Sequence, residues 1–197
     1  MSPAPRPDRG RLAGHGRPPG DASRRSPHTL DEGLAYLATA RFEGVQLDVD
    51  LKLPGYELEV VGALRRHGVL ERSLISSQYR SSLRAIRAAD PEVRLGWSVP
   101  KLRRDPFRSR ATRAPALVGL VALRQALPRR AASAIASRLC DAVMAHWRLV
   151  TPRLARAVRK AGGELYVWTV DERALLLRLE QMGVSGVITN DPRLFSA

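Results

Sequence analysis

Three side chains that could do chemistry share one face of a predicted strand. Residues Val45–Lys52 read Val-Gln-Leu-Asp-Val-Asp-Leu-Lys, so apolar and polar residues alternate. Side chains alternate between the two faces of a strand, which places Asp48, Asp50 and Lys52 on one face and the apolar residues on the other. Both faces of a parallel sheet are normally covered and apolar, so a fully polar face needs an explanation.

Two explanations of this polar face stay open. In the first, the strand lies at the edge of the sheet and its polar face is solvated. In the second, the polar face lines a binding site, where two carboxylates could hold a hard divalent cation and the lysine could neutralise a phosphate group. Asp50 and Lys52 would then lie nearest the carboxyl end of the strand, where α/β barrels place their active sites.

The elements that must position these side chains alternate between strands and helices. Thr29 and Glu32 have the spacing of a capping box at the start of a helix. We expect helices over Leu30–Ala40, Glu57–His67, Ser81–Ala89, Pro152–Ala161 and Glu172–Met182. We expect six strands over Val45–Lys52, Ser73–Ser76, Arg94–Val99, Ala142–Ala145, Leu165–Val170 and Gly186–Thr189. This alternation predicts an α/β fold with a parallel sheet built from right-handed crossovers.

Two segments depart from this alternation. Residues 1–27 are rich in Pro, Gly and Arg without a hydrophobic period, and we expect this segment to be disordered before a domain over 28–197. Residues 101–141 form an insertion at the rim of the sheet. It begins with the polar Lys101–Arg113, and an Ala- and Leu-rich stretch over Ala114–Leu139 follows, which predicts one or two helices split by Pro128.

Composition limits the function classes. The chain has 33 Lys and Arg against 19 Asp and Glu, a net charge of +14, but the excess lies in segments expected to be weakly structured. This distribution argues against a specific nucleic-acid partner, although nonspecific binding of polyanions stays open. The single cysteine, Cys140, excludes an intrachain disulfide and a cysteine-based zinc site. With no apolar run long enough for a signal peptide or a membrane span, we expect a cytoplasmic protein.

Five segments together resemble the glycerophosphodiester phosphodiesterase family. Asp50-Leu51-Lys52 is similar to the family's Glu-x-Lys strand, with Asp in place of Glu. Tyr166–Asp171 resembles its Trp-Thr-Val-Asn strand, and Gly183–Pro192 resembles its closing Gly-Val-Asp-Gly-Ile-Ile-Thr-Asp-x-Pro segment. Leu74–Ser77 and Thr29–Glu32 are similar to a strand ending in Ser-Ser and to the helix before the Glu-x-Lys strand. Their order and spacing agree with the family.

The resemblance implies a TIM-type (β/α)₈ barrel that hydrolyses glycerophosphodiesters to an alcohol and glycerol 3-phosphate in lipid metabolism, with a divalent cation, Mg²⁺ or Ca²⁺. It implies that Asp50 is a metal ligand, that Lys52 contacts the phosphoryl oxygens in catalysis, and that Trp168 lines the substrate pocket. Each has a simpler interpretation, because Lys52 could cap its strand and Trp168 could be an ordinary core aromatic. The sequence names neither the alcohol nor the cation.

The family's opening motifs do not occur in this chain: His-Arg-Gly, Pro-Glu-Asn-Thr, Glu-x-Asp and a His-Asp pair. Two βα units need about 30 residues each, and only residues 1–44 precede the first predicted strand. We therefore expect strands three to eight of an incomplete barrel, with poor hydrolysis and with open edges that allow self-association. The alternatives are a noncatalytic remnant that binds a phosphorylated ligand and an Arg-rich, nonspecific nucleic-acid binder. His146 follows a predicted strand, but a lone histidine is more often an ordinary loop residue.

Overall fold

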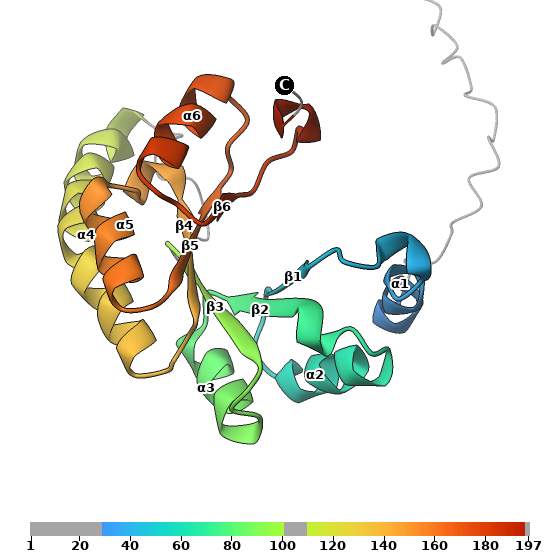
Figure 1. Cartoon of the computed structure of the whole chain (residues 1–197). Coiled ribbons are helices and arrows are strands. Elements are labelled where there is room, and N and C mark those ends of the chain that lie inside the picture. Colours follow the sequence, from blue (N-terminus) through green and yellow to red (C-terminus); the bar gives the residue numbers. More distant parts are fainter. Residues whose placement is uncertain (1–28, 101–109, 196–197) are drawn as a thin grey trace, which may run out of the picture.

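Six parallel strands form one curled sheet in the computed structural model, which describes residues 29–100 and 110–195. The strands lie in chain order, with every neighbouring pair parallel. They are β1 (Leu47–Leu51), β2 (Ser73–Ser77), β3 (Arg94–Val99), β4 (Ala142–His146), β5 (Glu164–Trp168) and β6 (Gly186–Val187). The sheet is curled (Figure 1). Among the described residues β1 and β6 do not pair with each other, so the curled sheet is an open half-barrel.

Helices follow the outside of this curve (Figure 1). They are α1 (Leu30–Leu37), α2 (Glu57–Arg66), α3 (Arg80–Ala89), α4 (Arg110–Ala136), α5 (Pro152–Lys160) and α6 (Arg173–Gln181). The structure also contains four short 3₁₀ turns, at Ala40–Phe42, Leu70–Arg72, Trp147–Leu149 and Pro192–Phe195. None of the described helices combines the length and apolar character needed to cross a lipid bilayer.

The predicted capping box at the start of α1 is confirmed. The Thr29 hydroxyl accepts a hydrogen bond of 3.2 Å from the Glu32 amide, and the Glu32 carboxylate accepts one of 2.8 Å from the Thr29 amide. Each bond satisfies a backbone donor that has no partner within the helix. The helix ends at Leu37, earlier than predicted, and a 3₁₀ turn over Ala40–Phe42 follows after Ala38 and Thr39.

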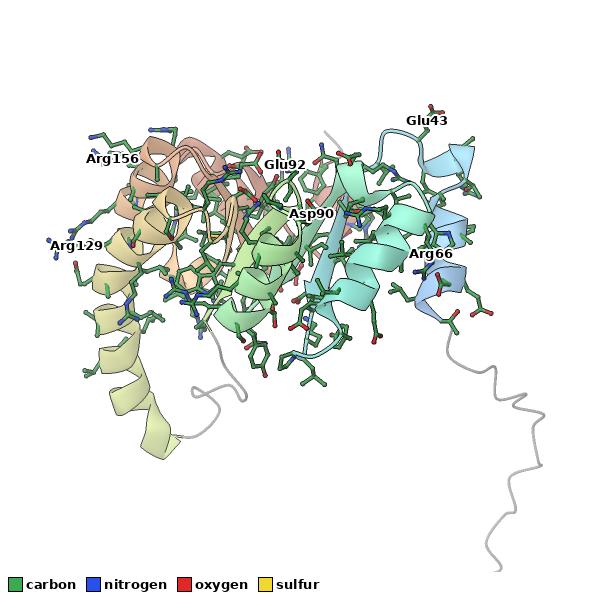
Figure 2. The ribbon with its side chains drawn as sticks, turned by 90° about the horizontal axis from the view of Figure 1, so that it is seen from below. Glu43, Arg66, Asp90, Glu92, Arg129 and Arg156 are labelled. Atoms are coloured by element: carbon green, nitrogen blue, oxygen red, sulfur yellow. The ribbon has the colours of Figure 1, made fainter. Side chains whose placement is uncertain are left out.

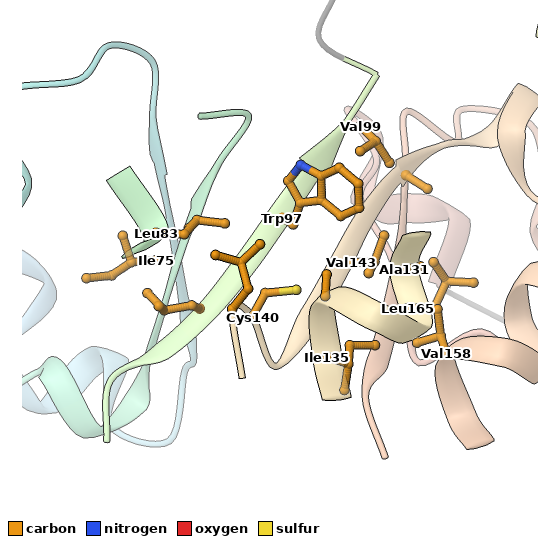
Figure 3. Packing of buried hydrophobic residues seen from close by; sticks show 14 of the residues in the cluster. Ile75, Leu83, Trp97, Val99, Ala131, Ile135, Cys140, Val143, Val158 and Leu165 are labelled. Atoms are coloured by element: carbon orange, nitrogen blue, oxygen red, sulfur yellow. The ribbon is translucent and has the colours of Figure 1, made fainter. Parts of the chain in front are cut away.

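The main core lies between the outer face of the sheet and the helices (Figure 3). Successive strands contribute apolar side chains that are almost fully buried: Leu51, Ile75, Leu95, Val143 and Leu165. The helices cover them with Leu64, Leu83, Ala131, Ile135 and Val158. Cys140 is a free thiol in this core, where burial raises its pKa to about 12.

The inner, concave face of the sheet carries a smaller apolar cluster. Leu74, Ala142 and Met144 are buried there, with Tyr166 and Trp168 packed against them. Gly96 lets the Ser76 and Met144 side chains pack closely on this face. A Cβ at position 96 would lie 3.1 Å from the Ser76 Cβ and 3.2 Å from the Met144 Cγ. The carboxyl ends of the parallel strands meet at one end of this face, which we call the mouth.

Other element bounds also differ from expectation, β5 ending at Trp168 and not at Val170, and one open alternative is settled. The edge strands are shorter than predicted, over Leu47–Leu51 and Gly186–Val187, because each has a neighbour on one side only. The insertion holds one continuous helix, α4, with no break at Pro128. Pro128 removes one intrahelical hydrogen bond, but buried Leu127 and Ala131 anchor the helix on either side of it. Residues 1–27 and 101–109, where disorder and a polar stretch were predicted, lie outside the described part of the chain.

Candidate active site at the mouth of the sheet

Strand β1 places Asp48 and Asp50 on the inner face of the sheet. Leu47 and Val49 pack against the main core and Leu51 is buried in it, so the carboxylates between them point the other way. The predicted alternation is therefore confirmed. β1 is also an edge strand among the described residues. Its polar face nevertheless lines a cavity.

That polar face lines a cavity of about 390 Å³ at the mouth. Every strand, or the residues directly after it, supplies part of the wall: Asp48, Asp50, Lys52, Ser76, Gln78, Ser98, Pro100, Met144, Trp168 and Ile188. The three site residues predicted from the sequence, Asp50, Lys52 and Trp168, all lie in this wall. The curvature of the sheet brings the first and fifth strands to opposite sides of one cavity.

Asp48 is held from the neighbouring strand. The hydroxyl of buried Ser76 donates a hydrogen bond of 2.8 Å to Asp48 Oδ1. Partial desolvation raises the pKa of the Asp48 carboxyl, the Ser76 hydrogen bond opposes that rise, and the charge of Asp50 adds to it. Asp48 matches no family motif, and its shared face with Asp50 was the only sequence signal for its place in the site.

Lys52 forms an ion pair with Asp50 at the outer rim of the cavity. The Lys52 side chain is 74% exposed and that of Asp50 is 35% exposed. An ion pair this open to water contributes little to stability. The ammonium group can therefore leave Asp50 at small cost and reach an anion that enters the mouth.

Trp168 is fixed against β4 while it lines the cavity. Its indole Nε1 donates a hydrogen bond of 3.1 Å to the Met144 carbonyl. Its ring meets the His146 ring edge to face, with centroids 5.0 Å apart. His146 Nδ1 accepts a hydrogen bond of 3.2 Å from the Arg148 amide, and His146 is not among the residues that line the cavity.

Asp171 joins the two motif segments at the far side of the mouth. Its carboxylate accepts hydrogen bonds from the Asn190 amide (2.8 Å), the Asn190 side chain (3.0 Å) and the Thr189 hydroxyl (3.1 Å). The hydrogen bonds from Asn190, assisted by that from Thr189, lower the pKa of Asp171. The loop after β5 is thereby tied to the segment after β6, beside the Ile188 wall of the cavity.

The oxygen atoms of the cavity suit a hard cation in part. Asp48 and Asp50 supply carboxylates, and Ser76, Gln78 and Ser98 supply neutral oxygens to the same wall. Mg²⁺ and Ca²⁺ prefer such oxygen ligands. Among the described residues no three His, Cys, Asp or Glu side chains cluster closely enough to hold a metal by themselves, so water or other oxygens would have to complete the coordination.

A family model described as "Glycerophosphoryl diester phosphodiesterase family" matches residues 55–194. The chain belongs to this family. The resemblance seen in the sequence motifs is thus confirmed. The matched range contains Trp168 but begins after Lys52, so the positions of Asp50 and Lys52 at the mouth are known from geometry.

Curated relatives of the glycerophosphoryl diester phosphodiesterase family match part of their own length. A glycerophosphodiester phosphodiesterase of Caldanaerobacter subterraneus is 26% identical over 141 residues, 71% of this chain and 47% of the relative. The Arabidopsis thaliana protein "Glycerophosphodiester phosphodiesterase GDPD4" is 33% identical over 95 residues, 48% of this chain and 28% of the relative. The chain spans about half the length, or less, of these relatives.

Solved structures of the family share the fold. A glycerophosphodiester phosphodiesterase from Parabacteroides distasonis superposes with a TM-score of 0.61 at 16% identity, over 84% of this chain and 60% of that one. An Oleispira antarctica phosphodiesterase in complex with the product sn-glycerol-3-phosphate has a TM-score of 0.57 at 20% identity, over 84% of this chain and 58% of that one. The curled parallel sheet with outer helices is therefore the arrangement of the family's barrel.

Proposed function

We propose that the mouth binds a glycerophosphodiester and hydrolyses it to an alcohol and glycerol 3-phosphate. The observation that carries this proposal is the convergence on one cavity of Asp50 and Lys52 with Trp168, which is far from them in the sequence. Family membership supports the reaction class. A structural neighbour that holds sn-glycerol-3-phosphate supports the product.

In this proposal Lys52 is the phosphoryl contact. Its exposed ammonium group lies at the entrance of the cavity, where it can move from Asp50 to the non-bridging oxygens of a phosphodiester. A positive charge there favours the extra negative charge that develops on these oxygens during hydrolysis. Trp168, held in place through Met144, forms the apolar wall against the glycerol or the leaving alcohol.

Asp50 would hold a divalent cation, Mg²⁺ or Ca²⁺, with Asp48 beside it. Ser76 keeps the Asp48 carboxylate in position for this task. A cation bound at these oxygens would neutralise phosphoryl charge and favour an ionised water molecule. The part of the chain that the structure describes does not form a complete ligand set, so we expect weak cation binding.

Proton transfer sets a limit on the rate. Asp48, Asp50 and Lys52 are the only titratable side chains in the described wall of the cavity, and His146 packs against Trp168 without lining the cavity itself. A missing general acid or base costs roughly 10²–10⁴ in rate. We therefore propose that this chain binds its ligand better than it turns it over.

The sheet itself would be an incomplete barrel, with six strands in the places of strands three to eight. Its edges would be β1 and β6, and open edges of a parallel sheet favour association. We expect dimers or larger species in size-exclusion chromatography with light scattering as the concentration rises. A monomer at every concentration would contradict this part of the proposal. A cytoplasmic location stays a prediction from the sequence.

The test compares two lysine variants. Lys52→Ala should weaken glycerol 3-phosphate binding by about tenfold, which corresponds to ~1.4 kcal/mol. Lys160→Ala, at an exposed lysine at the end of α5 away from the mouth, should leave binding unchanged. Isothermal titration gives the affinities, and product release from glycerophosphocholine with Mg²⁺ or Ca²⁺ gives the rate.

The outcomes separate the alternatives. Equal binding by both variants would refute the proposed site. Binding that depends on Lys52 without any product release would identify a noncatalytic phosphate-binding protein. A nonspecific nucleic-acid binder would instead bind oligonucleotides of any sequence with an affinity that collapses as salt is raised.

A further inference from the structure

Helix α4 is much longer than the layer of helices to which it belongs. Its 27 residues span about 40 Å, whereas the ten residues of α3 span about 15 Å, at ~1.5 Å per residue. Among the described side chains of α4, fully buried core residues begin at Leu127, and before them only Leu120 and Leu123, both partly buried, pack against the core. Because α4 enters from the mouth end, its N-terminal half projects beyond the mouth, past the ends of the other helices (Figure 2).

The projecting half carries an exposed apolar patch, formed by Leu117, Val118 and Val121. Their side chains are 56%, 71% and 51% exposed. Residues three and four apart are neighbours on a helix, so the three form one continuous surface. Exposed apolar patches at such a position mark a binding surface more often than single exposed residues do.

Other exposed apolar side chains lie at the same end of the molecule. Leu53 follows β1, Leu58 is in the first turn of α2, Ile188 follows β6, and Phe195 is in the last 3₁₀ turn. Each of the four lies near the carboxyl end of a strand or at the start of a helix, which is the end of the molecule that holds the mouth. The mouth is therefore surrounded by apolar groups, and α4 extends farthest.

The charge around this surface is positive. Residues 106–140 contain no Asp or Glu. Arg124, Arg129 and Arg130 follow the apolar patch along α4, are exposed, and have no hydrogen bond or ion pair within the described residues. A second copy of the chain would place like charges against each other here, whereas an anionic lipid surface complements both the arginines and the apolar patch.

We propose that the projecting half of α4 docks the mouth onto an anionic phospholipid surface. Leu117, Val118 and Val121 enter the boundary between headgroups and acyl chains, and the arginines contact lipid phosphates. The 390 Å³ cavity then faces the headgroups. Resting on the proposed function, this names the substrate class as a glycerophosphodiester that keeps one acyl chain and is carried in a lipid surface, so hydrolysis releases the headgroup alcohol and leaves an acylated glycerol 3-phosphate.

The experiment measures flotation of the full chain with vesicles of phosphatidylglycerol mixed with phosphatidylcholine. The double variant Val118→Asp/Val121→Asp should bind at least about tenfold more weakly, because each buried methylene contributes ~0.8 kcal/mol. Leu177→Asp is the matched control, since Leu177 is an exposed apolar residue on α6. It should bind as the unaltered chain does. Arg124→Gln/Arg129→Gln/Arg130→Gln should weaken binding and flatten its salt dependence.

Three results would overturn the proposal. One is unaltered flotation of the double variant, because the net charge alone would then account for binding. Another is equal flotation with pure phosphatidylcholine vesicles. The third is a double variant that floats normally but loses self-association of the chain, which would assign the patch to a second copy. Circular dichroism and the thermal midpoint confirm that each variant is folded.

The docking test is independent of catalysis. Vesicle binding is measured without substrate, so a failure of hydrolysis leaves its result intact. If docking and hydrolysis both hold, product release from lysophosphatidylcholine in anionic vesicles should exceed that from glycerophosphocholine, and Val118→Asp/Val121→Asp should remove the difference. Hydrolysis of both at the same rate would overturn the substrate class while leaving the proposed reaction in place.

Discussion

Ser76 on β2 holds Asp48 on β1 through a hydrogen bond of 2.8 Å from its hydroxyl to Asp48 Oδ1. Ser76 is 1% exposed, so the bond joins the two strands from beneath the cavity. Asp50, two residues farther toward the mouth, pairs with the exposed Lys52. The inner carboxylate is thus held by the fold, and the outer one by a side chain that a ligand can displace.

Removal of the Ser76 hydroxyl should raise the pKa of Asp48. The hydrogen bond favours the ionised carboxylate, while desolvation and the charge of Asp50 favour the protonated one. In Ser76→Ala the hydrogen bond is lost, and only the charge of Lys52 still opposes the rise of the Asp48 pKa. Carbon-detected NMR titration of the Asp48 carboxyl measures the change, with Ser98→Ala as the control in the same cavity wall. A pKa that stays or falls in Ser76→Ala would show that the hydrogen bond does not form.

Asp50→Ala should weaken the binding of Mg²⁺ or Ca²⁺ by at least tenfold, or ~1.4 kcal/mol. The physical reason is the loss of one of two carboxylates in the cavity wall. Asp31→Ala is the control, because Asp31 is an exposed carboxylate on α1 that pairs with Arg66. Isothermal titration with each cation gives the affinities. If the two variants bind the cation alike, Asp50 is not its ligand.

Asp171→Ala should lower stability at neutral pH, and the effect should fade in acid. The hydrogen bonds from Asn190 and Thr189 lower the pKa of Asp171 below its ordinary value of 3.8. A depressed pKa contributes stability above 3.8, which is lost as the pH falls through the value of the folded state. Thermal midpoints across this range measure the difference.

The matched variant for this prediction is Asp171→Asn. It keeps one acceptor oxygen for Asn190 and removes the charge, so its stability should not vary with pH through Asp171. The difference in thermal midpoint between Asp171→Ala and the unaltered chain should shrink in acid. If this difference is the same at every pH, Asp171 is not an ionised acceptor.

Gly163→Ala should destabilise the fold by about 1–3 kcal/mol through overpacking. A Cβ at Gly163 would lie 2.4 Å from the Ile135 Cδ1 and 3.0 Å from the Asp141 carbonyl oxygen. Gly33→Ala is the control, because nothing lies within 4 Å of its added Cβ. That helical substitution should stabilise by about 0.5–1 kcal/mol. Urea unfolding gives both values, and equal shifts in the two variants would be inconsistent with tight packing of α4 on β5.

Arg87→Ala should cost about 2–3 kcal/mol of stability. The guanidinium donates to the Arg138 carbonyl at 2.9 Å, the Val93 carbonyl at 3.0 Å and the Asp141 carboxylate at 2.6 Å. It is 15% exposed, and its loss would remove a donor from each of these acceptors, with the Leu95 amide still donating to Asp141. Arg84→Ala, an exposed arginine on the same helix, should change stability by less than about 0.5 kcal/mol. Chemical denaturation distinguishes the two.

The sequence by itself determined the features that depend on neighbouring residues. Alternation over Val45–Lys52 assigned Asp48 and Asp50 to one face, because the strand period of two is a local property of the backbone. The spacing of Thr29 and Glu32 determined the start of α1, because a capping box closes within one turn. The family motifs likewise identified Asp50, Lys52 and Trp168 before any arrangement in space was known.

Only the tertiary structure decided how these pieces meet. Curvature of the sheet places Trp168 opposite Asp50, and the strand register brings Ser76 within reach of Asp48. Helix α4 continues through Pro128 and projects beyond the mouth. These features depend on packing between residues far apart in the chain. The energy of such packing overrides a local signal such as a helix-breaking proline and leaves no period in the sequence.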